Sequence, residues 1–241
     1  MESIRSLKKQ PVILWILLFG ITMGFFESAV VIYLREIYFP GGFDFPLRPM
    51  SDRIYSTELF RELASLLMIV SVAYIAGSNA LNRFGYFLFI FAVWDIFYYV
   101  FLRLFILWPE SFLTWDVLFL IPVAWIGPVI CPLILSVTML VLAFLILDRD
   151  HHKKLKVPGY AWGLLTSGSV VVVLSFIWNY SVYMVNSVGF KDLMQLSDPD
   201  HISEAAFSYV PERLSWFLFV VGELIILSGI VLTGIPKIHK K

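Results

Sequence analysis

Six long apolar runs dominate this sequence and most strongly constrain its fold. They cover approximately residues 12–34, 58–80, 84–107, 129–148, 160–185 and 214–235. A transmembrane helix needs about 20 predominantly apolar residues, and each run is close to that length. Mean hydropathy is +0.83 and only 15% of residues are charged, against about 25% in soluble domains. The sequence predicts an all-α fold: a polytopic transmembrane bundle of about six helices in a single integral membrane domain, 1–241.

Basic residues outside the apolar runs predict the orientation of the bundle. They concentrate in four segments: Arg5, Lys8 and Lys9; Arg83; Arg149, Lys153, Lys154 and Lys156; and Lys237, Lys240 and Lys241. In a six-span protein these segments alternate onto one side of the membrane. Because cytoplasmic loops are enriched in lysine and arginine, both termini are predicted to be cytoplasmic. No small-residue cleavage site follows the first run, which is therefore predicted to be a retained span.

Prolines interrupt the chain before the fourth crossing. The apolar sequence between residues 115 and 148 contains Pro122, Gly127, Pro128 and Pro132. Proline removes a backbone donor and disrupts a helix, so a continuous helix is disfavoured here. We predict a helical or interfacial segment to about Ile121, a break around 122–128, and a crossing from about Val129. Broken backbone at membrane depth must be buried in protein or line a cavity. The alternative is a kinked helix or an interfacial elbow.

A carboxylate in the middle of the third run marks the face that we expect to be functional. Asp95 is followed by Tyr98, Tyr99, Leu102 and Arg103, which share one face of a helix. A charged group at this depth is costly in lipid, so the face is predicted to point inward.

Further polar residues in the runs extend this face into a candidate site. Glu27, Glu62 and Asn179 are predicted at intermediate depth, and Glu223 as deep as Asp95, whereas the cytoplasmic halves of the runs are apolar. The pattern predicts a polar funnel open to the outside. The candidate ligand- or proton-binding residues are Glu27, Arg35, Arg61, Glu62, Asp95, Tyr98, Tyr99, Arg103, Asn179 and Glu223. The alternative is that the glutamate–arginine pairs only fix the register of the helices.

Several local signals predict helix packing and helix ends. Gly20, Gly24 and Ser28 form a small-residue stripe that favours close approach of another helix. Ser56 or Thr57 is predicted to cap the second span, placing Glu58 in its first turn. Asp198–Pro199 predicts the start of a short helix over the outer face, although Asp200, His201 and Glu204 could also bind metal there.

Composition excludes several functional classes. Formal net charge is zero, which gives no case for nucleic-acid binding. The single cysteine, Cys131, excludes an internal disulfide or a cysteine cluster. The runs contain no histidine for haem ligation, and the chain has no HExxH, GxSxG or P-loop motif. His151 and His152 lie among lysines, which disfavours metal binding. We expect no metal and no cofactor, although the intramembrane carboxylates could bind a hard cation.

Three stretches resemble segments of a group of bacterial integral membrane proteins. They are FESAVVIYLREIYFP at 26–40, WDIFYY at 94–99 and WDVLFLIPVAWIGPV at 115–129. The group brings no established activity, so no catalytic residue is carried over. The resemblance implies a bacterial inner-membrane setting.

Three functional hypotheses follow from these patterns. The first is a membrane protein that binds or conducts a small molecule, ion or proton through the funnel. The second is a membrane-embedded enzyme that acts on a lipid-like substrate in the outer leaflet, with Asp95 or Glu62 as acid or base and Tyr98 or Tyr99 assisting. The third is an accessory subunit of a membrane complex whose charges hold helices together. The expected partners are membrane lipids, a small-molecule or ion ligand and another membrane protein.

Overall fold

The computed structural model describes residues 2–151 and 157–234, with side chains over 12–148 and 157–234. In chain order the elements are α1 (Glu2–Tyr38), α2 (Asp52–Ala76), α3 (Ala80–Ile106), β1 (Trp115–Phe119), β2 (Trp125–Pro128), α4 (Ile130–His151), α5 (Gly159–Val188), α6 (Phe190–Gln195), α7 (Pro199–Phe207) and α8 (Trp216–Gly234). Six of the helices are long and apolar enough to cross a membrane, which confirms the predicted polytopic fold.

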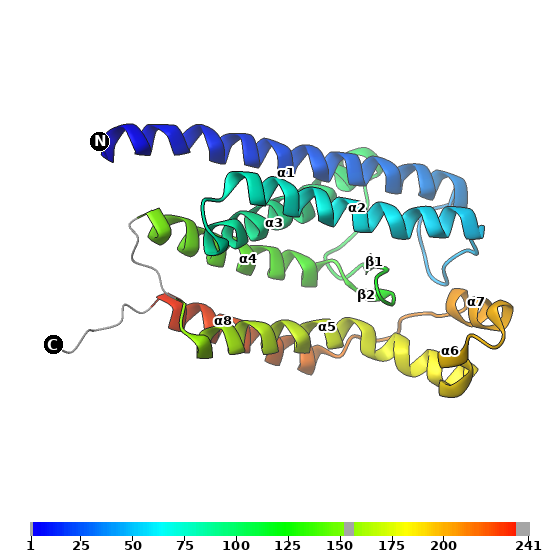
Figure 1. Cartoon of the computed structure of the whole chain (residues 1–241). Helices are drawn as coiled ribbons and strands as arrows, with labels where there is room; N and C mark the ends of the chain where they lie inside the picture. The colour runs from blue at the N-terminus through cyan, green and yellow to red at the C-terminus, as the bar shows by residue number, and fades with distance from the viewer. Residues whose placement is uncertain (1, 152–156, 235–241) are drawn as a thin grey trace.

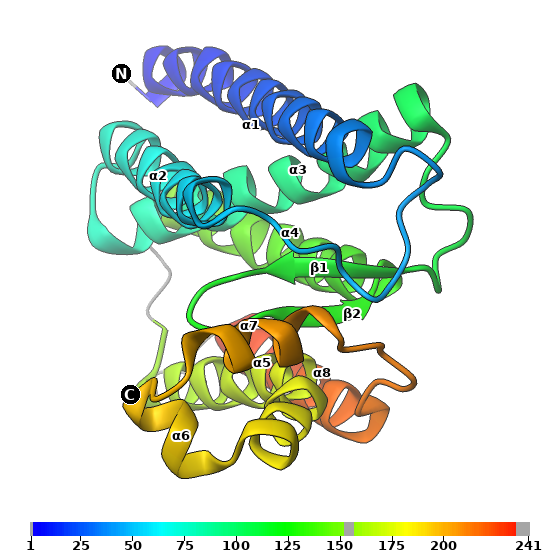
Figure 2. The same cartoon turned by 90° about the vertical axis from the view of Figure 1, so that its right-hand side faces the viewer.

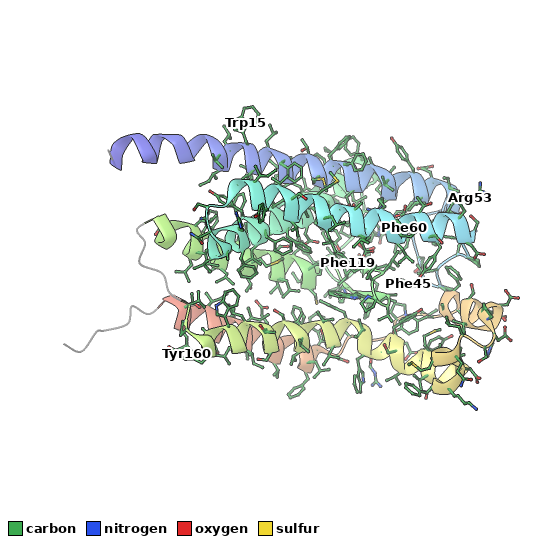
Figure 3. The ribbon with its side chains drawn as sticks, in the orientation of Figure 1. Trp15, Phe45, Arg53, Phe60, Phe119 and Tyr160 are labelled. Atoms are coloured by element: carbon green, nitrogen blue, oxygen red, sulfur yellow. The ribbon has the colours of Figure 1, made fainter. Side chains whose placement is uncertain are left out.

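The long helices form two groups that lie side by side along one axis. Helices α1 to α4 pack together, and α5 pairs with α8 beside them (Figures 1 and 2). The hairpin of β1 and β2, the short helices α6 and α7 and the loop of residues 39–51 gather at one end, here called the hairpin end. Helix α1 begins and α8 ends at the opposite end (Figure 1). Large apolar side chains such as Trp15, which is 67% exposed, project from the outside of the bundle (Figure 3).

The predicted small-residue stripe of the first span forms the seam between α1 and α3. A Cβ atom added to Gly20 would lie 2.8 Å from Val93 Cγ1, and one added to Gly24 would lie 2.9 Å from the carbonyl oxygen of Trp94. Ser28 in the same stripe is fully buried. Two helices can approach this closely only where small residues face the partner backbone.

A second small-residue seam joins α5 to α8. A Cβ atom added to Gly168 would lie 2.8 Å from the Gly222 carbonyl oxygen and 2.9 Å from the Ile226 backbone nitrogen. A Cβ atom on Gly222 would lie 2.8 Å from the Val172 backbone nitrogen. The backbone atoms of α5 lie directly against those of α8 at this seam, so the two helices form a tightly packed pair.

The second span begins earlier than the sequence predicted. Helix α2 starts at Asp52, and the side chain of Ser51 caps it by accepting a hydrogen bond from the Ile54 backbone N–H at 3.4 Å. The prediction of a cap at Ser56 or Thr57 is therefore wrong, and Glu58 lies beyond the first turn. The serine directly after the proline-rich loop is the better cap because it has extended backbone and the helix follows it without interruption.

The segment before the fourth crossing is a β-hairpin, so the prediction of a helix up to about Ile121 is wrong. Strands β1 and β2 pair antiparallel, with Asp116 opposite Gly127. Trp115, Val117 and Phe119 in β1 are aromatic or β-branched residues, which favour a strand. The predicted break at 122–128 covers part of the connection between the strands and all of β2. Pro132 lies in the first turn of α4, where a missing backbone donor costs little. The predicted start of the crossing near Val129 is confirmed.

The short helix predicted to start at Asp198–Pro199 is confirmed as α7. Asp198 caps it by accepting a hydrogen bond from the His201 backbone N–H at 3.1 Å. Asp200, His201 and Glu204 are exposed, and no group of three or more metal-binding side chains occurs within the described residues. The helix lies at the hairpin end (Figure 2).

We predict that Gly168→Ala destabilises the α5–α8 pair because the new methyl group meets fixed backbone atoms. Overpacking of this kind costs about 1–3 kcal/mol. Gly163→Ala on the same helix is the matched control, since nothing lies within 4 Å of its Cβ position; it should be neutral or stabilising by up to about 1 kcal/mol. Thermal unfolding in detergent compares the two. Equal unfolding temperatures of the two variants would contradict the close packing of α5 and α8 at Gly168.

Candidate functional site

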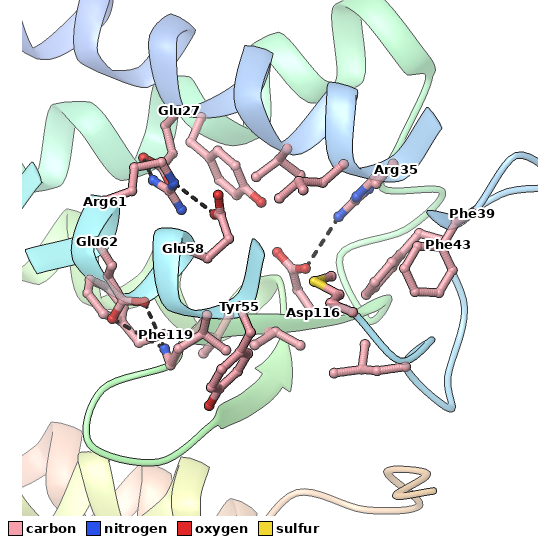
Figure 4. Close-up of a pocket in the computed structure, with 18 of the residues that line it drawn as sticks. Glu27, Arg35, Phe39, Phe43, Tyr55, Glu58, Arg61, Glu62, Asp116 and Phe119 are labelled. Atoms are coloured by element: carbon pink, nitrogen blue, oxygen red, sulfur yellow. Dashed lines mark hydrogen bonds and ion pairs between the residues drawn. The ribbon is translucent and has the colours of Figure 1, made fainter. Parts of the chain in front are cut away.

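A cavity of about 180 Å³ lies between α1, α2, α3 and the hairpin, at the hairpin end of the bundle (Figure 4). It exceeds the roughly 150 Å³ of an engineered protein cavity that accommodates benzene. Its walls are largely apolar and aromatic, including Val31, Leu34, Trp94 and Phe119. The ionisable acidic and guanidinium groups in its lining are Glu27, Arg35, Glu58, Arg61, Glu62, Asp95 and Asp116.

Arg61 joins two carboxylates on the α1–α2 side of the cavity. Its Nη1 donates to Glu27 Oε2 at 2.5 Å, and its Nε donates to Glu58 Oε2 at 2.8 Å. Glu58 and Arg61 are three residues apart on α2 and therefore share a face. One guanidinium balances only one of the two negative charges, so the cluster keeps a net negative charge when both carboxylates are ionised.

Glu62 holds the connection between the two strands. Its Oε2 accepts the Leu120 backbone N–H at 2.9 Å, and its Oε1 accepts the Ile121 N–H at 3.3 Å. These donors lie beyond the end of β1 and have no partner in the ladder. Buried backbone donors need an acceptor, and Glu62 supplies it from α2. No salt bridge to Glu62 forms within the described residues.

Arg35 and Asp116 form a second buried ion pair at the other end of the cavity (Figure 4). Arg35 Nη2 lies 3.4 Å from Asp116 Oδ1, and the Tyr99 hydroxyl donates to Asp116 Oδ2 at 3.2 Å. The guanidinium also lies 3.6 Å from the ring centroid of Trp108 and 4.3 Å from that of Phe43. Aromatic faces attract cations, so Arg35 is held by one carboxylate and two rings.

The Asp116 carboxyl is the most strongly perturbed acid outside the six candidate spans. Burial raises its pKa to about 6, and the neighbouring Arg35 and the Tyr99 hydroxyl only partly offset the cost of removing the charge from water. At 3% exposure the group has almost no contact with solvent. The Asp116 carboxyl therefore loses its proton as the pH rises through about 6.

Asp95 lines the cavity from α3 and points toward α4. Its Oδ2 accepts a hydrogen bond from the Ser136 hydroxyl at 2.8 Å. Tyr98 and Tyr99 follow on the next turn, with ring centroids 4.8 Å apart, and both line the cavity. The single neutral donor leaves Asp95 without a cationic partner within the described salt bridges.

The structure brings seven of the ten predicted site residues to this cavity and places three elsewhere. The seven are Glu27, Arg35, Arg61, Glu62, Asp95, Tyr98 and Tyr99. Arg103 is exposed and donates to the carbonyl oxygens of Leu107 and Pro109, in the segment that directly follows the end of α3. The Asn179 Nδ2 group donates to the Arg213 carbonyl oxygen at 2.6 Å, on the α5 side of the molecule.

Glu223 also lies outside the cavity. It accepts a hydrogen bond from the Thr138 hydroxyl between α8 and α4. The sequence predicted it beside Asp95 from depth alone, but α8 packs mainly against α5 and to a smaller extent against α4. Two residues at the same depth in the bundle, such as Asp95 and Glu223, need not lie on neighbouring helices.

Sequence reasoning missed three titratable residues of the cavity: Tyr55, Glu58 and Asp116. Tyr55, Glu58 and Glu62 are spaced three and four residues apart, which is a helical face, and an earlier start for α2 would have revealed it. Asp116 lies in WDVLF, a short apolar run with one polar residue, whose periodicity does not distinguish a strand from a helix. No signal in the sequence therefore places Asp116 in the cavity.

The chain matches no protein-family model, and no curated protein and no solved structure is similar to it at a significant level. The class of protein is therefore inferred from the helices of the chain itself. Six helices long and apolar enough to cross a membrane indicate a multi-pass membrane protein. Membership of the bacterial group stays a prediction.

We predict that Asp116→Asn raises thermal stability at pH 8 and has little effect near pH 4. The pKa of Asp116 is higher in the folded protein than the roughly 3.9 of a free aspartate. Its contribution to stability is therefore complete below about pH 4 and is lost as the pH rises through about 6. Asparagine cannot ionise and keeps an acceptor for Arg35, so the gain at pH 8 is on the order of 2–3 kcal/mol.

Thermal unfolding in detergent at the two pH values measures this effect. Glu36→Gln is the control, because Glu36 is exposed and lies outside the cavity. A variant less stable than the wild type at pH 8 would show instead that attraction to Arg35 exceeds the cost of burial.

Proposed function

We propose that the cavity is an outward-facing site that binds or conducts a small molecule, ion or proton. The observation that carries this proposal is the concentration of seven acidic and guanidinium groups around a cavity at one end of the bundle, whereas Glu223 is buried elsewhere, between α4 and α8. Intramembrane ionisable residues are expensive to bury and are kept mainly for function. Below the cavity the bundle is packed with apolar side chains such as Ile69 and Ile90, both 0% exposed.

An outer groove supports access from the hairpin end. It has a volume of about 590 Å³ and is lined by the loop of residues 42–49 and by the end of α7. Phe39, Leu47 and Phe207 line both the groove and the cavity, so the two spaces adjoin at these three side chains. A ligand would pass from the groove between apolar side chains into the cavity.

The proposal includes an orientation with both termini in the cytoplasm and the hairpin end outside, in a bacterial inner membrane. The positive-inside rule supports it. Arg83 lies in the first turn of α3, close to the connection from α2, and α3 begins at the end of the bundle at which α1 begins (Figure 1). Lys153, Lys154, Lys156, Lys237, Lys240 and Lys241, which also support the orientation, lie outside the described residues.

The contacts support binding over an accessory role. An accessory subunit would pair every carboxylate with arginine or tyrosine and leave no cavity, whereas Glu62 and Asp95 have only neutral donors beside an open space. A catalytic acid or base needs a free oxygen within reach of a substrate. Both oxygens of Glu62 accept backbone donors and the Tyr99 hydroxyl is directed at Asp116, which disfavours these two residues in an enzyme. Asp95, which accepts one hydrogen bond from Ser136, is the residue that would carry the enzymatic alternative.

We predict that a cysteine in the cavity is accessible to water from the outside. Cys131 is buried and is the chain's single cysteine, so Cys131→Ser provides a background without thiols. Val117→Cys places a near-isosteric thiol in the cavity lining. A membrane-impermeant methanethiosulfonate reagent added outside intact cells should modify it.

Val141→Cys is the matched control. Val141 is 51% exposed on the outer surface of α4, where lipid should exclude the reagent. Leu34→Cys provides a second position in the cavity lining if Val117→Cys does not fold. Modification of the cavity thiols only from the cytoplasmic side, or only after denaturation, would refute the proposed outward opening.

A further inference from the structure

The lining of the cavity has an excess of acidic groups. Five carboxyl groups and two guanidinium groups line it, and no lysine or histidine does so within the described residues. Arg61 is shared between Glu27 and Glu58, and Arg35 is engaged by Asp116. Glu62 and Asp95 therefore have no cation of their own. Unbalanced negative charge in a low-dielectric space is costly, so protons or a bound cation must reduce it.

We infer that the cavity binds a small organic cation that carries an oxygen acceptor. This inference rests on the proposed function and adds the chemical class of the ligand. The negative side of the cavity, formed by Glu27, Glu58 and Glu62, faces the charge of the cation. The apolar and aromatic walls receive its body.

A bare metal ion fits the cavity less well than an organic cation does. The carboxylates come from separate elements: Glu27 from α1, Glu58 and Glu62 from α2, Asp95 from α3 and Asp116 from β1. No three of the described histidine, cysteine, aspartate or glutamate side chains converge in a manner that could hold a metal ion. A hard cation needs about six to eight oxygen ligands at short range. An organic cation needs diffuse negative potential and apolar contact instead.

Aromatic rings in the cavity provide a surface that suits such a cation. Tyr55, Trp94, Tyr98 and Phe119 contribute to its lining. Rings attract ammonium groups by about 0.5–2 kcal/mol each, and cages of this kind recognise quaternary ammonium ligands. Arg35 between Trp108 and Phe43 shows that this part of the fold already holds one cation against two rings.

An unused donor in the wall indicates the second part of the ligand. Arg35 is only 8% exposed and lines the cavity, yet its Nη1 makes no hydrogen bond within the described structure. A buried donor without a partner costs about 1–3 kcal/mol, and more for a charged group. An oxygen on the ligand would satisfy it, while the cationic end lies toward Glu58 and Glu62 at the other end of the cavity (Figure 4).

Choline is the probe of choice because it joins a quaternary ammonium group to a hydroxyl. Its neutral carbon isostere, 3,3-dimethyl-1-butanol, has the same shape and hydroxyl without the charge. The corresponding acid anion, 3,3-dimethylbutyrate, reverses the charge. Protection of Val117→Cys from thiol modification, in the Cys131→Ser background, measures occupancy of the cavity for each compound.

Choline is expected to protect Val117→Cys at concentrations at least tenfold lower than 3,3-dimethyl-1-butanol, and 3,3-dimethylbutyrate is expected to give no protection. Equal protection by the alcohol, or stronger protection by the anion, overturns the inference while the outward-facing site stands. If the thiol is not modified at all, the proposed function itself fails. Propyltrimethylammonium, which lacks the hydroxyl, should protect more weakly than choline; equal protection removes the oxygen acceptor from the inference.

Variants that neutralise a carboxylate in the cavity provide an independent test of the inference. Glu62→Gln should weaken protection by choline at least tenfold, whereas Glu36→Gln, on an exposed site outside the cavity, should leave it unchanged. Asp95→Asn is the second variant if Glu62→Gln disturbs the strand connection, since asparagine still accepts from Ser136. Unchanged protection in both cavity variants overturns the inference. Choline should also raise the unfolding temperature of the wild type, because a ligand of the folded state stabilises it.

Discussion

The fold of the site depends on one carboxylate that satisfies backbone donors inside an apolar bundle. Non-helical backbone at membrane depth needs partners supplied by the protein itself, and Glu62 supplies them to Leu120 and Ile121. This contact ties the hairpin to α2. The hairpin in turn carries Asp116 to Arg35 and Phe119 to the cavity wall. Removing the acceptor would free the strand connection and the walls that it positions.

The polar groups divide between holding the structure and facing the cavity. Arg35 and Arg61 fix α1 against the hairpin and α2, as helix-register charges do. Their pairing is nevertheless incomplete, because more carboxyls than guanidiniums surround an open space. A purely structural network gains nothing from that imbalance. Such an imbalance is what the proposed binding function requires, since functional sites commonly retain groups that do not favour stability.

Hydropathy predicted the six long helices, and ionisable and tyrosine residues within the apolar runs or at their ends predicted seven of the ten titratable residues that line the cavity. Burial of small residues at Gly20 and Gly24 followed directly from their spacing. The hairpin was missed because a short apolar run looks the same as strand or helix to a periodicity count. Glu223 was misplaced because depth says nothing about which helices are neighbours; the α5–α8 seam, which decides it, depends on contacts between residues far apart in the chain.

The glycine seam of α5 and α8 also constrains the order in which the protein can be assembled. Helices α1 to α4 pack mainly on one another, so that group can form as soon as its last member is inserted. Helix α5 must wait for α8, which follows it in the chain, before the backbone face around Gly168 is covered. The first group can therefore form during synthesis while α5 still lacks its partner. Insertion of α8 is the step that covers this face of α5.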